Sequence, residues 1–77
     1  MEKRYVPVVV RIDENGKVNP KIIEFGDKKY RIDKILDCHP AACQSVGGVG
    51  VKYQCRVLGR ETELWEENGR WFVVAKR

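Results

Sequence analysis

The chain has 77 residues, of which 43% are hydrophobic and 34% charged, and its fifteen Lys and Arg outnumber its eleven Asp and Glu for a net charge of +4. This composition is typical of a folded globular protein and excludes a disordered chain. A chain of this length builds one core, so we predict a single small β domain over residues 1–77. The mild charge permits an anionic partner but is not the segregated excess typical of a dedicated nucleic-acid-binding protein.

The sequence contains no apolar stretch approaching the ~18 residues that a membrane helix needs. The apolar run Val8–Val10 is interrupted by Arg11, which makes it too short for the core of a signal peptide. We therefore expect a cytoplasmic protein without membrane association. Its three cysteines are then expected to be reduced thiols.

The first predicted strand covers Tyr5–Asp13, and Asn15-Gly16 follows it as a two-residue type I′ hairpin turn. That turn would set Ile12 opposite Asn19. The strand pattern places alternate apolar residues on one face, and these are Val6, Val8, Val10 and Ile12.

Two further strands are predicted to follow, and a break in the alternation comes at their end. Pro20–Phe25 is the second strand, Gly26-Asp27 is a tight turn, and Lys29–Leu36 is the third strand. The inward residues of these strands would be Ile23, Phe25, Tyr30 and Ile32. Adjacent apolar residues at Ile35 and Leu36 break the alternation, which either a β-bulge or a single helical turn explains.

The stretch Asp37–Gly50 is predicted to be an irregular loop, with a short helix over residues 41–46 as an alternative. It ends in Gly47-Gly48-Val49-Gly50. These glycines lack the lysine of a phosphate-binding loop, so we expect them to permit a bend or a close backbone approach.

The C-terminal part predicts a strand over Val51–Val57, a turn at Gly59-Arg60, and a hairpin of Thr62–Glu67 and Arg70–Lys76 around Asn68-Gly69. The inward residues of the first of these strands are Val51, Tyr53, Cys55 and Val57. The fold class expected from the whole pattern is all-β, with five to six antiparallel strands in a meander that closes into a small, closed or open barrel.

The turn positions predict which side chains share a face of the last hairpins. Trp65 would lie opposite Phe72 and Leu64 opposite Val73, and Gln54 would lie beside Trp65. Leu64 and Val73 would then face the core, and Arg56 would lie beside Glu63 and near Arg31. The other face would carry cations and stackable rings, and its candidate binding residues are Arg31, Lys52, Gln54, Arg56, Trp65 and Phe72.

Surfaces that combine cations with aromatic rings bind single-stranded nucleic acid, because each nucleotide offers a base to stack and a phosphate to pair. The alternative is that a loop, the N-terminal segment or a second subunit covers Trp65 and Phe72. This second interpretation predicts an interface or a small second core instead of a nucleic-acid site.

A second constellation contains the cysteines and the histidine, which are Cys38, His39, Cys43 and Cys55. Closed zinc sites use such residues, but no Cys-x-x-Cys spacing occurs and the side chains of Cys38 and His39 would diverge. We therefore expect no metal, no cofactor and no enzymatic activity, and we expect Cys55 to lie in the core. A Cys38–Cys43 disulfide would require an oxidising compartment.

Two segments resemble small bacterial β-domains of unknown function. Phe25–Leu36 has their Phe-Gly-x-x-x-Tyr-x-Ile-x-x-Ile-Leu pattern, and Arg70-Trp71-Phe72-Val73 is similar to their final hairpin. The resemblance covers residues 20–75 and implies a shared fold, but no activity. The expected function is that of a non-catalytic binding or interaction module, whose partner is a protein or a second copy. The alternatives are the nucleic-acid-binding barrel and a Cys/His metal or redox module.

Overall fold

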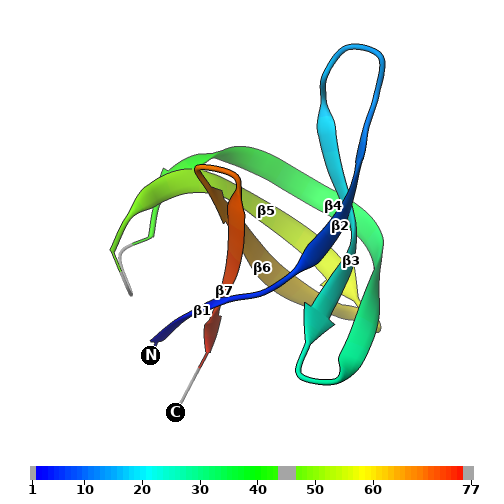
Figure 1. Cartoon of the computed structure of the whole chain (residues 1–77), viewed down its shortest axis with the longest axis vertical. Coiled ribbons are helices and arrows are strands. Elements are labelled where there is room, and N and C mark those ends of the chain that lie inside the picture. Colours follow the sequence, from blue (N-terminus) through cyan, green and yellow to red (C-terminus); the bar gives the residue numbers. More distant parts are fainter. Residues whose placement is uncertain (1, 44–46, 76–77) are drawn as a thin grey trace.

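The computed structural model describes residues 2–43 and 47–75, which form one antiparallel sheet of seven strands shaped as an open half-barrel (Figure 1). The strands are β1 (Glu2–Tyr5), β2 (Val8–Ile12), β3 (Val18–Phe25), β4 (Lys28–Ala42), β5 (Val49–Val57), β6 (Arg60–Glu67) and β7 (Arg70–Ala75). The all-β antiparallel prediction is confirmed, although the strand count of five to six was too low. Over the described ranges there is no helix, and hence none with the length and apolarity to cross a membrane.

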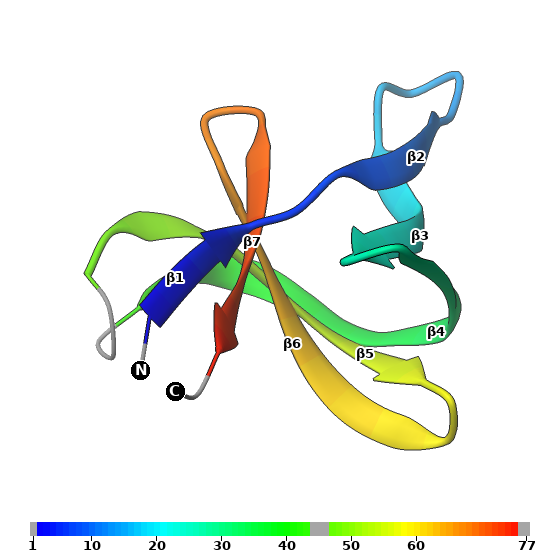
Figure 2. The same ribbon diagram turned by 60° about the horizontal axis from the view of Figure 1, so that its bottom comes forward.

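The N-terminal segment joins the two edges of the sheet. The strand order is β1-β7-β6-β5-β4-β3-β2, so β2 to β7 form a meander while β1 pairs with β7. The chain passes from one edge to the other at Val6-Pro7, where the Val6 N–H donates to the Trp71 carbonyl and the Pro7 carbonyl accepts from the Glu24 N–H, each at 2.9 Å. The single strand predicted over Tyr5–Asp13 is therefore two strands with different partners, and Figure 2 shows the segment crossing the opening.

The β2–β3 hairpin has a different turn from the predicted one. Its loop contains three residues, Glu14, Asn15 and Gly16, because the Asp13 carboxylate accepts hydrogen bonds from the N–H groups of Asn15 and Lys17, both at 2.9 Å. Ile12 consequently lies opposite Val18, not Asn19. This one-residue change of register is confined to the turn end of the hairpin, because a bulge between Val9 and Val10 compensates it and leaves Val8 and Ile23 facing the core. This hairpin projects from the body of the molecule (Figure 1), and its Val10 and Ile12 are exposed rather than inward.

Strand β4 extends much further than predicted. Its register with β5 shifts between Ile32 and Lys34 and again between Ile35 and Asp37, so the break in alternation is explained by bulges and not by a helical turn. These bulges bend the strand, which pairs first with β3 and then with β5. The predicted irregular loop is strand up to Ala42 and again from Val49. The alternative helix is wrong for residues 41–43, and its remainder, 44–46, lies outside the described residues.

The last two hairpins follow the prediction closely, apart from one turn. Asn68 and Gly69 have positive φ angles of 52° and 83°, as a type I′ turn requires. The preceding loop is Leu58-Gly59 rather than Gly59-Arg60, since Val57 pairs with Arg60. This moves the register by two residues, which changes the cross-strand neighbours but keeps every side chain on its predicted face.

Two hydrophobic clusters lie on opposite faces of the sheet. The inner cluster fills the half-barrel and includes Val6, Ile23, Ile32, Tyr53, Cys55 and Leu64, with Phe25, Val57 and Val73 partly buried against it. The outer cluster consists of Cys43, Trp65 and Phe72, with Ala41 and Val74 against it. The predicted inward residues Val51, Tyr53, Cys55 and Val57 all belong to or pack on the inner cluster.

Candidate functional site

The structure buries the two rings of the predicted binding face. Trp65 and Phe72 are paired across β6 and β7 and stack at 5.9 Å with an interplanar angle of 10°, as the register predicted. They are only 5% and 2% exposed, so they form the outer cluster and present no face to a base. Their burial matches the alternative in which the chain itself covers them.

The polar members of that face are spread along the outer surface. Lys52, not Gln54, lies opposite Trp65, and its ammonium is 3.2 Å from the Glu63 carboxylate. Gln54 lies opposite Glu63, and Arg56 lies opposite Glu61 rather than Glu63. Arg31 pairs with Ile22 of β3, whereas Arg56 pairs with Lys34 of β4, so the two arginines are not direct neighbours.

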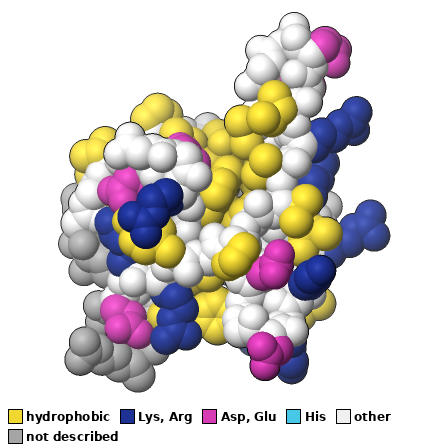
Figure 3. All heavy atoms as spheres, viewed as in Figure 1, with side chains coloured by type: hydrophobic (Ala, Val, Ile, Leu, Met, Phe, Trp, Pro, Cys, Tyr) yellow, Lys and Arg dark blue, Asp and Glu magenta, His cyan; other side chains and the backbone are white. Residues whose placement is uncertain are grey.

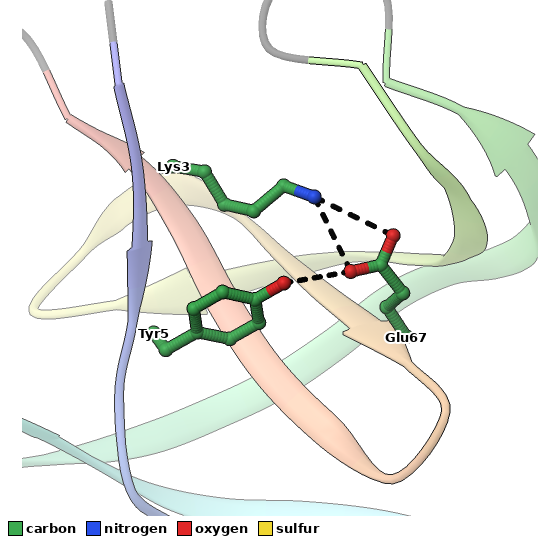
Figure 4. A network of polar contacts seen from close by, with 3 residues as sticks. All are labelled: Lys3, Tyr5 and Glu67. Atoms are coloured by element: carbon green, nitrogen blue, oxygen red, sulfur yellow. Dashed lines mark hydrogen bonds and ion pairs between the residues drawn. The ribbon is translucent and has the colours of Figure 1, made fainter.

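Strand β1 covers the outer cluster and is held there by a polar network (Figure 4). The Lys3 Nζ is 3.2 Å from Oε1 of Glu67, and the Tyr5 hydroxyl donates to the same oxygen at 2.8 Å. Lys3 also lies 4.6 Å from the centre of the Phe72 ring, and the Arg70 guanidinium lies 3.6 Å from the centre of the Tyr5 ring. We call Lys3, Tyr5, Glu67 and Arg70 the N-terminal clamp.

The clamp shifts the titration of its own members. Hydrogen bonds from Tyr5 and Lys3 lower the pKa of the Glu67 carboxyl below its usual value. Partial burial opposes ionisation of Lys3, but the hydrogen bond and charge of Glu67 outweigh it and raise the pKa of the ammonium. The polar groups of Lys3, Tyr5 and Glu67 are used in hydrogen bonds to one another. We therefore interpret the clamp as a structural contact that holds β1 in place.

The cysteines and the histidine are not assembled into a ligand set. Cys38 faces Tyr53, whereas the neighbouring His39 faces Lys52 and its Nδ1 lies 2.8 Å from Asp37 Oδ2. Cys43 lies in the outer cluster, and all three cysteines are free thiols. Within residues 2–43 and 47–75 no three His, Cys, Asp or Glu side chains are grouped as a metal site would require.

The buried thiol and phenol of the inner cluster also titrate abnormally. Burial raises the pKa of Cys55, whose Sγ donates to the Thr62 carbonyl at 3.3 Å. Burial, followed by the neighbouring Cys38 and Glu66, raises the pKa of Tyr53 to about 12. Both groups are therefore neutral near pH 7, and Cys55 behaves as the small hydrophobic residue that the sequence predicted.

A mostly apolar hollow of about 600 Å³ lies on the open side of the half-barrel. Its lining is mostly aliphatic and aromatic, and the residues are Ile23, Phe25, Tyr30, Val57, Leu58, Arg60, Thr62 and Val73. Leu58 stands at its rim and is 73% exposed. We call this region the open hollow.

The open hollow exists because β6 and β7 separate. Their pairing runs from Glu67↔Arg70 to Trp65↔Phe72 and is not continued to the N-terminal half of β6, while β7 goes on to pair with β1. Thr62 and Val73, which belong to the two separated strands, both line the hollow. The segment Arg60–Leu64 therefore has β5 on one side and, among the described residues, no strand on the other.

Hydrophobic and basic side chains also reach the surface near β2 and β3. Figure 3 shows hydrophobic side chains along the projecting β2–β3 hairpin and Lys and Arg side chains along its flank. The hydrophobic side chains include Val9, which is 47% exposed, and Ile12, which is 62% exposed. Among the strands of the described residues, β2 pairs with β3 alone, so it is an edge strand, and Arg11 is its one charged residue.

Sequence reasoning missed both the clamp and the open hollow. Lys3 and Glu67 are 64 positions apart, and the only available signal was their opposite charge. Leu58 was missed because the turn was placed one residue too late, at Gly59-Arg60. The pair Leu58-Gly59 resembles the Asn68-Gly69 turn in ending with glycine, which is the one hint the sequence offered.

Comparisons with known protein families, with curated proteins and with solved structures found no match to this chain. The resemblance of Phe25–Leu36 to small bacterial β-domains therefore stays a prediction.

Proposed function

We propose that this protein is a non-catalytic interaction module that holds an apolar part of a protein partner in the open hollow. The observation that carries the proposal is the hollow itself, an apolar depression left uncovered between β6 and β7 while the chain seals the apolar outer face. Binding sites in proteins are concave and mostly apolar, with a few polar groups at the rim. The polar groups of the lining here belong to Arg60, Thr62 and the hydroxyl of Tyr30.

The exposed rim residue Leu58 supports this proposal. Its φ angle is 53°, a conformation that favours glycine or asparagine over leucine. The leucine contributes little to the core because most of its surface lies in solvent. An exposed leucine in an unfavourable conformation is explained if it contacts a partner.

The test is to select phage-displayed random peptides on the folded chain and titrate the selected peptides by NMR. We expect chemical-shift changes at Val57, Leu58 and Val73, and at least tenfold weaker binding by Leu58→Asn. Val49→Asn is the matched control, because Val49 is similarly exposed at 75% but does not line the hollow. Failure to enrich any peptide, or shift changes confined to the N-terminal clamp, would contradict the proposal.

Self-association through β2 is the alternative protein contact. Unpaired, apolar edge strands readily pair with another chain, and β2 exposes Val9 and Ile12 at the sheet edge. Sedimentation velocity at rising concentration would show a dimer that Ile12→Lys abolishes. A monomer at all concentrations would leave the open hollow as the only proposed contact.

Single-stranded nucleic-acid binding remains a second candidate because of the exposed cations on the outer face of β4 and β5. Lys29, Arg31, Lys34 and Arg56 are exposed, and none of them forms an ion pair with another described residue. The burial of Trp65 and Phe72 removes stacking, so such binding would be electrostatic and strongly salt-dependent. Fluorescence anisotropy of a labelled oligonucleotide at 50 mM salt, with Arg31→Ala and Arg56→Ala as variants, tests it directly.

A further inference from the structure

The edge of β6 beside the open hollow has main-chain groups without a strand partner. Val57↔Arg60 closes the two-residue loop, and in such a hairpin the closing pair exchanges both of its main-chain hydrogen bonds. Hydrogen-bonded and non-hydrogen-bonded pairs then alternate along the ladder. Arg60, Thr62 and Leu64 therefore direct their N–H and C=O groups to β5, and Glu61 and Glu63 direct theirs away from it.

Independent contacts agree with this assignment. The Cys55 thiol reaches the Thr62 carbonyl at 3.3 Å, which places that carbonyl on the β5 side. From the other hairpin, Glu67↔Arg70 closes the Asn68-Gly69 loop, so alternate residues back along β6 face β7. Counting back from Glu67 gives Trp65, Glu63 and Glu61, and the pairing with β7 ends at Trp65. The main-chain groups of Glu61 and Glu63 thus form an unpaired edge.

We infer that the partner binds in an extended conformation and adds as a strand to this edge of β6. The inference rests on the proposed function, because the hollow is the site that receives the partner's side chains. An added strand would bond to the N–H and C=O groups of Glu61 and Glu63 and direct alternate side chains into the hollow. The main-chain hydrogen bonds would give affinity that does not depend on the partner's sequence, and the hollow would select for apolar side chains.

Charge at the edge defines the chemistry of the partner. Glu61 and Glu63 are both exposed and face outward, so the outward side chains of the added strand would lie directly beside two carboxylates. On β5, Lys52 already pairs with the Glu63 carboxylate at 3.2 Å, so Glu61 is the edge carboxylate that no ion pair among the described residues neutralises. On the inner side, Arg60 at the rim opposes a second cation. The favoured partner therefore alternates apolar inward residues with basic outward residues.

A pair of synthetic peptides tests this alternation. The probe is an acetylated and amidated heptapeptide in which valine alternates with lysine, and its control alternates valine with glutamate. We expect the lysine peptide to bind at least tenfold more tightly at 50 mM salt, with the difference reduced by Glu61→Lys. Equal binding of the two peptides would overturn the charge assignment.

Backbone N-methylation tests strand addition with the unmodified protein. Methylating the valine or the lysine amides removes alternate donors, so one of the two methylated peptides should lose binding at least tenfold and the other should bind nearly as before. Amide hydrogen exchange should slow at Glu61 and Glu63 on binding. Equal effects of both methylations, or unchanged exchange at these amides, would overturn the inference.

Proline variants supply a second test on the protein side. Proline is tolerated where the strand N–H points away from the sheet, so Glu61→Pro should fold and bind the lysine peptide at least tenfold more weakly. Ile12→Pro is the matched control on the β2 edge and should bind normally; the reverse result would move the site to β2. If the peptide binds, responds to Leu58→Asn and ignores both methylation and proline, strand addition fails while the proposed function stands. If neither peptide binds at millimolar concentration, both fail.

Discussion

The two apolar faces of this sheet differ in how completely other parts of the chain cover them. The outer cluster is small but well covered, because the Tyr5 and Lys3 side chains of β1 lie against the Phe72 ring and the residue after β4, Cys43, packs into the cluster. The inner cluster is larger but remains open where β6 and β7 separate. A short chain that covers the lesser apolar face and leaves part of the greater one exposed has an uncovered surface suited to another molecule.

Polar contacts reinforce the difference. The clamp ties β1 to the end of β6 through Lys3, Tyr5 and Glu67, and these contacts lie over the outer cluster. At the open hollow the contact from β1 is a cation–π contact, in which the Arg4 guanidinium lies 5.3 Å from the centre of the Phe25 ring. The outer face is consequently expected to be rigid and the hollow adaptable.

The largest expected effect comes from matched truncations of two phenylalanines. Phe72→Ala should destabilise the fold by about 3–5 kcal/mol, because a fully buried ring leaves a cavity. Phe25→Ala should cost only about 1–2 kcal/mol, because the Phe25 ring is partly in solvent already. Urea unfolding followed by circular dichroism measures both, and equal losses would mean that the hollow is as closed as the outer cluster.

A smaller loss of folding stability is expected on substitution of Gly50, where β5 passes close to the backbone of β6. A Cβ at this position would collide with the Glu66 carbonyl oxygen, a backbone atom that cannot move freely. Gly50→Ala should therefore destabilise the fold by about 1–3 kcal/mol, whereas Val49→Ala should have almost no effect. Thermal unfolding of the two variants checks this. An unchanged melting temperature for Gly50→Ala would show that the strands are not in such close contact.

The clamp predicts a pH dependence that belongs to the outer face alone. The pKa of Glu67 is lowered in the folded state, so its stabilisation is present above its unfolded pKa of about 4.5 and is lost as the pH falls through the folded value. The pKa of Lys3 is raised, so its stabilisation is present below about 10.5 and is lost as the pH rises through the folded value. Glu67→Gln should lower the melting temperature at pH 7 and lose that difference in strong acid.

The matched control for this titration is Glu61→Gln, whose carboxylate lies on the exposed edge of β6. Its melting temperature should follow the wild type across the whole pH range. A constant difference between Glu67→Gln and the wild type down to pH 2 would show that the Glu67 charge is not the source of the stabilisation.

The smallest expected effect is at Leu58, where stability and binding should change in opposite directions. Asparagine suits the positive φ angle, so Leu58→Asn should raise the free energy of unfolding by up to about 1 kcal/mol. The same variant should bind partner peptides more weakly. A clear loss of stability would mean that Leu58 belongs to the core and is not a contact residue.

The sequence predicted the β5 to β7 region well because its signals are local. The Asn68-Gly69 turn fixes the pairing of Trp65 with Phe72, and strict alternation fixes which residues face inward. The preceding turn was predicted at Gly59-Arg60 but lies at Leu58-Gly59. This error did not change which side chains face inward, because it moved the register by two residues. The β2–β3 hairpin was predicted less well, because the Asp13 side chain lengthened its loop by one residue and changed the pairing near the turn. The bulge between Val9 and Val10 then restores the predicted pairing, so Val8 and Ile23 still face the core.

Local sequence signals were enough to predict the all-β class, the faces of the C-terminal strands and the turns at Gly26-Asp27 and Asn68-Gly69, because these depend on alternation and on residues with special φ preferences. Which apolar surface is covered depends instead on the tertiary structure. Trp65 and Phe72 are buried because β1 crosses to the far edge at Val6-Pro7, and the hollow is open because β7 leaves β6 for β1. Both outcomes depend on pairing between segments more than 60 residues apart, for which no local pattern exists.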